Sequence, residues 1–145
     1  MAAINISKDK ALIDVSYIHQ FLTKAYWSNG RTLEEVVRSM EQCTCYGVYL
    51  DKQQIGFARI LTDHVVFAYI MDVFIDPEFR GKGYSKLLLD AIDIDPDLTN
   101  VQTWYLKTGD AHGLYRQYGY DELKDIGVWM ERKEDKDAPD PNRIN

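Results

Sequence analysis

The sequence predicts an α/β (α+β) fold in which helices cover both faces of a mixed, mostly antiparallel central sheet. Two observations lead to this prediction. Between residues 46 and 75, strand-like apolar stretches alternate with short polar turns, which indicates an antiparallel meander. A strand, a helix and a further strand then follow between residues 67 and 106, an order that requires a right-handed parallel crossover. A chain of 145 residues with 46% hydrophobic residues suits one domain with its own core.

The first third of the chain predicts a short edge strand and two helices. Residues 4–6 alternate in polarity, and residues 15–26 carry apolar side chains at helical spacing. After a break at residues 27–31, Thr32 and Glu35 form the pattern of a capping box and start a second helix. The meander follows, with strands predicted at 46–50, at 55–61 and from Phe67 onward.

The second half predicts a helix at 84–93, a strand at 101–106, a short helix at 111–118 that stops at Gly119, and a final strand at Val128–Met130. We expect a single domain over residues 1–132. Residues 133–145 are charged and contain Pro139 and Pro141, so they are predicted to form a mobile tail.

Composition narrows the class of protein. The net charge of −6 argues against nucleic acid as a general partner, because a phosphate backbone requires a basic face. We find no apolar run long enough to span a bilayer and no basic leader, so we expect no membrane partner and a cytoplasmic location. The sequence does not fix the oligomeric state, and a homodimer is compatible with it.

The two cysteines and three histidines give little support for a metal site. Cys43 and Cys45 stand two residues apart, which is poor geometry for a disulfide, and we expect both to be reduced. No Cys-x-x-Cys pair is present and the histidines are widely scattered, so we expect no metal.

The turn between the strand ending near Ile75 and the helix starting near Tyr84 is rich in glycine and in positive charge. A helix start offers free backbone N–H groups and a favourable dipole to an anion, and Gly81 and Gly83 allow close approach of a phosphate. Arg80, Lys82 and Lys86 add charge around the turn. The alternative is an ordinary glycine turn with solvated lysines.

Two segments together resemble the GNAT N-acetyltransferase superfamily. Residues 80–85, Arg-Gly-Lys-Gly-Tyr-Ser, are similar to its acyl-CoA pyrophosphate loop, with Ser85 in place of the usual last small residue. Residues 111–120 are similar to its Ala-x-x-Leu-Tyr-x-x-x-Gly-Phe/Tyr segment. Three residues before this segment, Thr108 stands where the family usually has asparagine. The resemblance covers roughly residues 4–130 and implies the GNAT fold.

The resemblance also implies acetyl-CoA as cosubstrate. The strand at 73–75 is expected to splay from its parallel neighbour and to hold the pantetheine arm through its backbone, with one N–H directed at the thioester oxygen. Thr108 offers a hydroxyl to the same arm. The predicted cosubstrate-binding residues are Val73, Phe74, Ile75, Arg80, Gly81, Lys82, Gly83, Tyr84, Ser85, Thr108 and Tyr115.

Three residues are candidates for proton transfer. Tyr115 matches the family tyrosine that protonates the CoA thiolate, although a packing role is the alternative. Asp72 is the first candidate for the general base, because a carboxylate within an apolar strand is uncommon. It alternatively faces solvent or pairs with Arg59. His112 is the second candidate for the base, with a surface position as its alternative.

The acceptor pocket is expected beside the first two helices and their connection. Trp27 provides a surface for stacking and Arg31 a partner for a carboxylate, which would suggest a zwitterionic amine. Tyr69 is assigned to the same pocket. In the alternative, Trp27 closes the core and Arg31 is solvated.

From the resemblance we expect an acetyl-CoA-dependent N-acetyltransferase whose acceptor is the primary amine of a small molecule, attacked directly in a ternary complex. One alternative is a non-catalytic acyl-CoA-binding or regulatory domain. Another is a protein or peptide N-acetyltransferase. The sequence identifies neither the acceptor nor the preferred acyl chain.

Overall fold

The computed structural model describes residues 3–134 of the 145-residue chain. The chain forms two compact units, one up to Gly109 and one from Asp110 onward. Most of the tail predicted at 133–145 lies outside the described residues.

The first unit is built on one five-stranded sheet. Its strands run in the order of the sequence, with antiparallel pairing from the first to the fourth and parallel pairing between the last two. They are β1 (Ile4–Ser7), β2 (Thr44–Leu50), β3 (Gln53–Thr62), β4 (Phe67–Ile75) and β5 (Thr103–Leu106). This topology confirms the predicted mixed, mostly antiparallel sheet.

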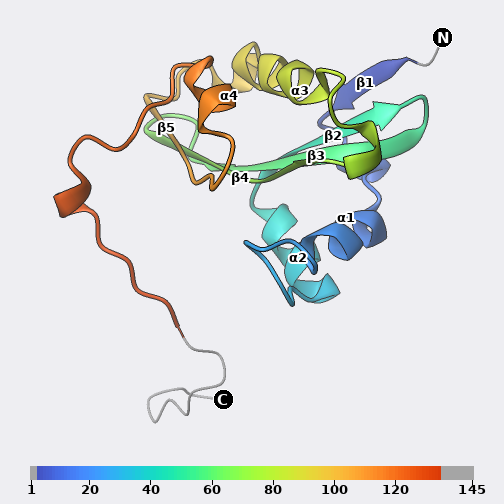
Figure 1. Ribbon diagram of the computed structural model, residues 1–145, viewed down its shortest axis with the longest axis horizontal. Helices are drawn as coiled ribbons and strands as arrows, with labels where there is room; N and C mark the ends of the chain where they lie inside the picture. Colours follow the sequence, from blue (N-terminus) through green and yellow to red (C-terminus); the bar gives the residue numbers. More distant parts are fainter. Residues whose placement is uncertain (1–2, 135–145) are drawn as a thin grey trace. The chain divides into compact units, whose positions relative to one another are not determined.

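Helices lie on both faces of this sheet, as predicted (Figure 1). The helices α1 (Val15–Leu22) and α2 (Leu33–Glu41) lie below it in the view of Figure 1, and α3 (Tyr84–Asp93) lies above it. The capping box of Thr32 and Glu35 is present at the start of α2. The first helix ends at Leu22 instead of Tyr26, because the chain turns back and the Gly30 N–H donates to the Thr23 carbonyl.

The core fills both spaces between sheet and helices. Strands β2 and β3 are buried along nearly their whole length, which explains why their sequences are apolar on both sides. One cluster packs between the sheet and the α1–α2 pair, and its buried residues are Ile13, Ile18, Leu22, Val36, Met40, Cys43, Cys45, Phe57 and Phe74. Both cysteines are free, and burial raises the pKa of the Cys45 thiol to about 11.

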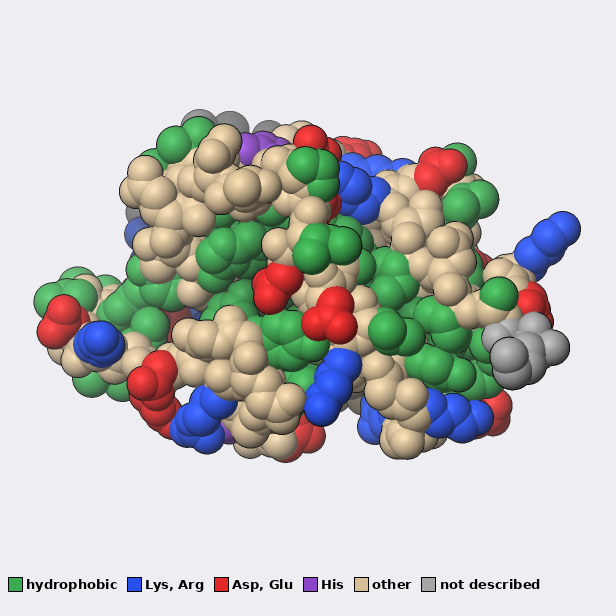
Figure 2. Space-filling model, turned by 90° about the horizontal axis from the view of Figure 1, so that it is seen from above, with side chains coloured by type: hydrophobic (Ala, Val, Ile, Leu, Met, Phe, Trp, Pro, Cys, Tyr) green, Lys and Arg blue, Asp and Glu red, His purple; other side chains and the backbone are tan. Residues whose placement is uncertain are grey.

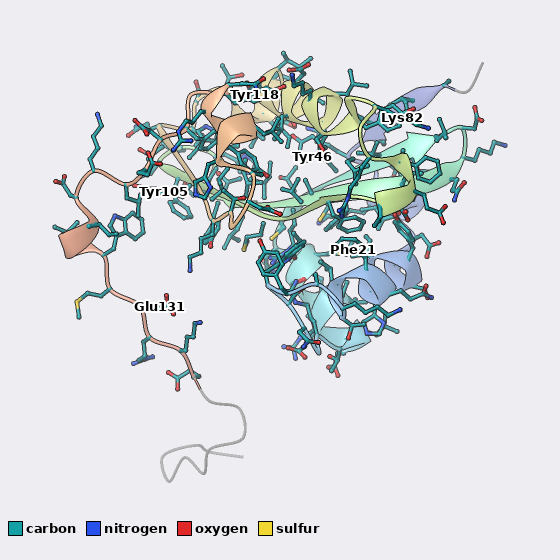
Figure 3. All side chains as sticks on the ribbon, viewed as in Figure 1. Phe21, Tyr46, Lys82, Tyr105, Tyr118 and Glu131 are labelled. Carbon is teal, nitrogen blue, oxygen red and sulfur yellow. The ribbon has the colours of Figure 1, made fainter. Side chains whose placement is uncertain are left out.

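The buried carboxylate of Asp95 joins the other face of the sheet to the chain after α3. Asp95 precedes a 3₁₀ turn (Pro96–Leu98) and accepts hydrogen bonds from Lys8 and from the Tyr46 hydroxyl. Tyr46 extends from β2 toward α3, as Figure 3 shows. Lys8 also binds Asp97, at 2.8 Å. This contact ties the end of β1, the middle of β2 and the end of the helical layer together.

Strand β4 is irregular in the half that approaches α3. The register with β3 shifts between Phe57 and Arg59, which marks a β-bulge opposite Ala58. Asp72 lies in this bulge with φ +56°, a value that is uncommon for a residue other than glycine. The Asp72 side chain in this bulge contacts Trp27 and Arg31, which lie in the connection between α1 and α2.

Strand β4 is longer than its parallel partner β5. Their parallel pairing ends at Ile70 with Leu106, whereas β4 continues to Ile75. The backbone of residues 71–75 therefore extends beyond the end of β5, and the splay predicted for residues 73–75 stays a prediction.

The second unit contains the short helix α4 (His112–Arg116) and a 3₁₀ turn (Ile126–Val128). The Tyr115 and Tyr120 rings make an edge contact with centroids 5.9 Å apart, and Arg116 forms an ion pair with Glu122. The final strand predicted at 128–130 is wrong. Val128 belongs to the 3₁₀ turn, and among residues 3–134 no strand ladder includes this segment.

Candidate active site

The glycine turn before α3 has the conformation that its sequence predicts. Gly81 and Gly83 adopt φ values of +79° and +82°, and a Cβ atom added at either would have no atom within 4 Å. Only glycine adopts this conformation without strain, and the space around the two Cα atoms is open. The backbone of the turn is therefore accessible to a ligand at these two positions.

The first turn of α3 has no side-chain cap. Asp14 and Thr32 cap α1 and α2 by accepting hydrogen bonds from the backbone, but α3 begins at Gly83 without such an acceptor. The N–H groups of a helix's first turn have no acceptor within the helix, and the helix dipole favours negative charge at this end. An anionic ligand such as a pyrophosphate fits this donor set.

Three exposed cations surround the turn. The Arg80 Nε atom donates to the Ile75 carbonyl at 2.9 Å, which holds the guanidinium group against the end of β4. The Lys82 ammonium lies 5.9 Å from the Phe79 ring centroid, and Figure 3 shows Lys82 at the turn before α3. Lys86 follows on the first turn of α3. Oxyanions of a nucleotide would find both backbone donors and positive charge here.

The pantetheine-binding residues predicted from the resemblance lie near the end of the parallel pairing between β4 and β5. The Val73 side chain is partly exposed. The side chains of Phe74 and Ile75 are buried, so these two residues are suited to contact a ligand only through their backbone. Thr108 follows β5 by two residues and is partly buried. The assignment of these residues to cosubstrate binding stays a prediction.

Asp72 is the centre of a hydrogen-bonded cluster. Its Oδ2 atom accepts from Arg31 Nη1 at 2.7 Å and from Arg59 Nε at 2.9 Å, and its Oδ1 atom accepts from Trp27 Nε1 at 3.1 Å. Its side chain is 2% exposed. Three predicted site residues, Trp27, Arg31 and Asp72, are thus brought together, and Arg59 is the pairing partner considered as the alternative.

This cluster carries an excess of positive charge. Burial by itself would lower the pKa of the Arg59 guanidinium, but the Asp72 carboxylate outweighs that effect and raises it. The other two Arg59 nitrogens donate to sulfur atoms, of Cys43 at 3.4 Å and of Met71 at 3.5 Å. Sulfur is a weak acceptor, so one carboxylate balances two guanidinium groups.

Aromatic rings extend the cluster along α1 and the chain that follows it. Phe21 stacks on Phe74 with centroids 3.8 Å apart and lies 6.1 Å from Trp27, and Figure 3 shows Phe21 between α1 and the sheet. Trp27 in turn meets Tyr26 edge-on at 5.0 Å. Trp27 is 41% exposed, so one part of its ring is fixed by the core while another part faces solvent.

The exposed end of this aromatic row approaches the loop after β5. A Cβ atom added at Gly109 would lie 3.0 Å from the Tyr26 hydroxyl oxygen. The connection between α1 and α2 therefore reaches the loop that follows Thr108. Tyr69 is outside the Asp72 cluster, since its ring contacts Phe67 edge-on at 6.4 Å.

Sequence reasoning missed Tyr26 and Phe21 as parts of this region. The sequence places both residues in the helix predicted at residues 15–26 and gives neither of them a role in the site. The run of aromatic residues at 26–27 before a glycine was the available indication. The pairing of Asp72 with Arg59 is one of the sequence-based alternatives, but the additional bonds of Asp72 to Arg31 and Trp27 are not apparent, because a bulge leaves no simple pattern in the sequence.

The two remaining catalytic candidates belong to the second unit. Tyr115 lies in the middle of α4 and is buried, and its backbone N–H donates to the Ala111 carbonyl. His112 is the first residue of α4 and is exposed.

Residues 3–134 contain no group of three or more His, Cys, Asp or Glu side chains suited to hold a metal ion. Within the same range, no helix has the length and apolarity needed to cross a membrane. On the face shown in Figure 2, acidic and basic side chains are interspersed among hydrophobic ones.

Comparisons with known proteins identify the family of the chain. The family model described as "Acetyltransferase (GNAT) domain" matches residues 41–122. A peptidyl-lysine N-acetyltransferase of Salmonella typhimurium is 31% identical, over 78% of this chain and 77% of its own length.

Solved structures of acetyltransferases are similar to this chain. A protein of Xanthomonas campestris pv. campestris, assigned to the GNAT family, has a TM-score of 0.88 at 39% identity and covers 92% of this chain and 95% of its own. A predicted acetyltransferase of Clostridium acetobutylicum, solved with acetyl-CoA, has the same fold, with a TM-score of 0.66 at 17% identity over 92% of this chain and 96% of its own. The chain therefore belongs to the GNAT family of acetyltransferases.

Proposed function

We propose that this protein transfers the acetyl group of acetyl-CoA to the primary amine of a small molecule, by direct attack within a ternary complex. The observation that carries the proposal is the glycine turn at the uncapped start of α3, where backbone donors and three cations suit a pyrophosphate. Acetyl-CoA bound there supplies the activated acetyl group.

Residues of the chain have separate roles in this proposal. Residues 80–86 bind the pyrophosphate, and the backbone of residues 73–75 holds the pantetheine arm and polarises the thioester oxygen. Tyr115 donates a proton to the departing thiol. In the balanced reaction the amine nitrogen forms an amide bond, the thioester C–S bond breaks, and the proton lost by the amine balances the one gained by the thiol.

The bonds of Asp72 favour an anchoring role over the predicted role as general base. Both carboxylate oxygens already accept hydrogen bonds from Trp27, Arg31 and Arg59, so neither is directed at a substrate amine. We assign Asp72 to the positioning of Arg31 and Trp27. Proton removal from the amine then falls to His112 or to a chain of water molecules.

A peptide acceptor is the second candidate, and one observation favours it. The Salmonella relative acts on peptidyl lysine and covers most of the chain at 31% identity. A small-molecule acceptor is favoured by Trp27 and Arg31, which offer one partly exposed aromatic surface and one partly exposed guanidinium on either side of the same carboxylate.

The test is release of free thiol from acetyl-CoA against a panel of amines, amino acids and lysine peptides. We expect turnover with small amines and little with the peptides. Turnover with peptides alone would replace the small-molecule proposal by the peptide one. Tight CoA binding without any turnover would support the non-catalytic binding domain.

A further inference from the structure

We propose that the acceptor carries a carboxylate as well as its amine, and that Arg31 is the residue that recognises the carboxylate. This inference rests on the proposed N-acetyltransferase function and names the chemical class of its acceptor. It starts from the charge of the Asp72 cluster, in which two guanidinium groups share one carboxylate. A partly buried excess of one positive charge favours an anionic ligand.

Arg31 is the member of the cluster that a ligand can reach. Its side chain is 21% exposed, against 11% for Arg59 and 2% for Asp72. Its hydrogen bond to Asp72 uses one N–H of Nη1, while a guanidinium has five N–H donors in a planar fork. The remaining donors suit bidentate binding of a planar carboxylate.

The anchoring of Arg31 makes it a prepared binding group. The side chain is held at 2.7 Å by Asp72, which is itself fixed by Arg59 and by the Trp27 indole. A guanidinium fixed in this way loses less conformational entropy on binding than a free surface arginine.

The position of Arg31 relates the carboxylate to the reaction. Asp72 immediately precedes Val73, the first residue of the strand edge proposed to hold the pantetheine arm. Trp27 offers an apolar surface beside it, with 41% of the residue exposed. The acceptor that fits is an amino acid or a similar amine with a carboxylate and an apolar body.

The experiment uses matched acceptors with the full-length protein and acetyl-CoA. Each set contains an amino acid, its amide and the amine formed by decarboxylation, such as phenylalanine, phenylalaninamide and phenethylamine. Sets with longer spacing between amine and carboxylate are included. The amide has a less basic amine, so intrinsic reactivity at neutral pH favours the amide, opposite to the expected preference.

We expect kcat/KM for the best amino acid to exceed that of its amide and its decarboxylated amine by at least tenfold. Arg31→Ala should remove at least tenfold of this preference, because kcat/KM for the amino acid should fall by a larger factor than kcat/KM for the decarboxylated amine. Arg38→Ala is the matched control, since Arg38 is an exposed arginine on α2 whose ion pair with Glu34 spans 3.8 Å. It should behave as the wild type.

A second readout does not depend on turnover. The N-acetylated amino acid retains the carboxylate, and its binding in the presence of CoA is measured by calorimetry. We expect binding to the wild type and to Arg38→Ala, and at least tenfold weaker binding to Arg31→Ala, with circular dichroism showing that the variant is folded.

The outcomes separate the two proposals. Equal use of the amino acid, its amide and its amine would overturn the carboxylate inference and leave the N-acetyltransferase proposal standing. Equal loss toward all three acceptors in a folded Arg31→Ala would also overturn it. Absence of turnover with every amine would overturn the proposed function, and the calorimetry would then decide the carboxylate inference separately.

Discussion

Asp72 joins side chains from three distant parts of the chain, namely Trp27 and Arg31 before α2 and Arg59 on β3. Its φ of +56° costs on the order of 1–3 kcal/mol for a residue other than glycine. Such a conformation persists only where surrounding contacts determine it, and the three donors provide those contacts. At the scale of single residues, the site depends on this carboxylate.

Replacing Asp72 by alanine should therefore destabilise the protein strongly. The change leaves two guanidinium groups without their shared carboxylate, one of them buried, which typically costs about 3–5 kcal/mol. The free energy of unfolding from denaturant titration measures the effect. Glu34→Ala removes an exposed carboxylate with a 3.8 Å ion pair and should change stability by less than about 0.5 kcal/mol. Equal effects of the two changes would contradict the central role of Asp72.

Tyr115→Phe should slow acetyl transfer by about 10²–10⁴-fold with little effect on stability or CoA affinity. Only the hydroxyl is removed, so the edge contact with Tyr120 is kept. Single-turnover rates measure the chemical step. The loss should shrink with a thioester whose thiol is more acidic, since that thiolate needs less protonation. A wild-type rate in the phenylalanine variant would limit Tyr115 to packing.

At the scale of elements, the strand, glycine turn and helix between residues 67 and 93 position the proposed cosubstrate site. Gly81 and Gly83 both need positive φ, and the helix begins without a side-chain cap. The sequence predicted this element closely, because a glycine turn between a β-rich run and an amphipathic run is a strong local pattern.

Gly83→Val should weaken CoA binding by about tenfold or more. A β-branched residue at a φ of +82° costs roughly 1–2 kcal/mol or more, so the turn relaxes and its N–H groups lose their common direction. Gly83→Asn is the control, since asparagine tolerates this conformation better, and it should retain most of the affinity. Calorimetric titration with CoA measures both. Equal affinities in the valine variant and the wild type would mean that the turn does not hold the pyrophosphate.

At the scale of the whole first unit, Asp95 ties the sheet to the chain after α3. Burial of Asp95 opposes its charge, but the bonds from Lys8 and Tyr46 outweigh burial and lower the pKa of its carboxyl group. A folded pKa below the unfolded value of about 3.9 gives stability that is complete above that value and is lost as the pH falls through the folded one.

Asp95→Asn should therefore lower stability at pH 7 and should make the remaining stability fall less steeply than that of the wild type from pH 5 to pH 3. Denaturant titrations at several pH values measure this dependence. Glu41→Gln, an exposed change at the end of α2, should retain the wild-type slope. An unchanged slope in Asp95→Asn would show that Asp95 is not the origin of acid sensitivity.

The accuracy of the sequence-based predictions followed the range of the interactions involved. Local patterns located the capping box of Thr32 and Glu35, the helix at 84–93 and the hairpin, because each depends on neighbouring residues. The strand predicted at 128–130 failed because a strand needs a pairing partner that a short apolar run does not specify. The double pairing of Asp72 escaped because a bulge and long-range contacts create it.

The most direct test of the central claim follows thiol release and acetylated amine in the same samples while both substrates are varied. The account predicts one acetylated amine for each thiol released, with double-reciprocal lines that intersect, as direct attack in a ternary complex requires. Thiol release without acetylated amine, or no release with any amine despite CoA binding, would contradict N-acetyl transfer. Parallel lines with an acetylated enzyme would contradict the direct attack.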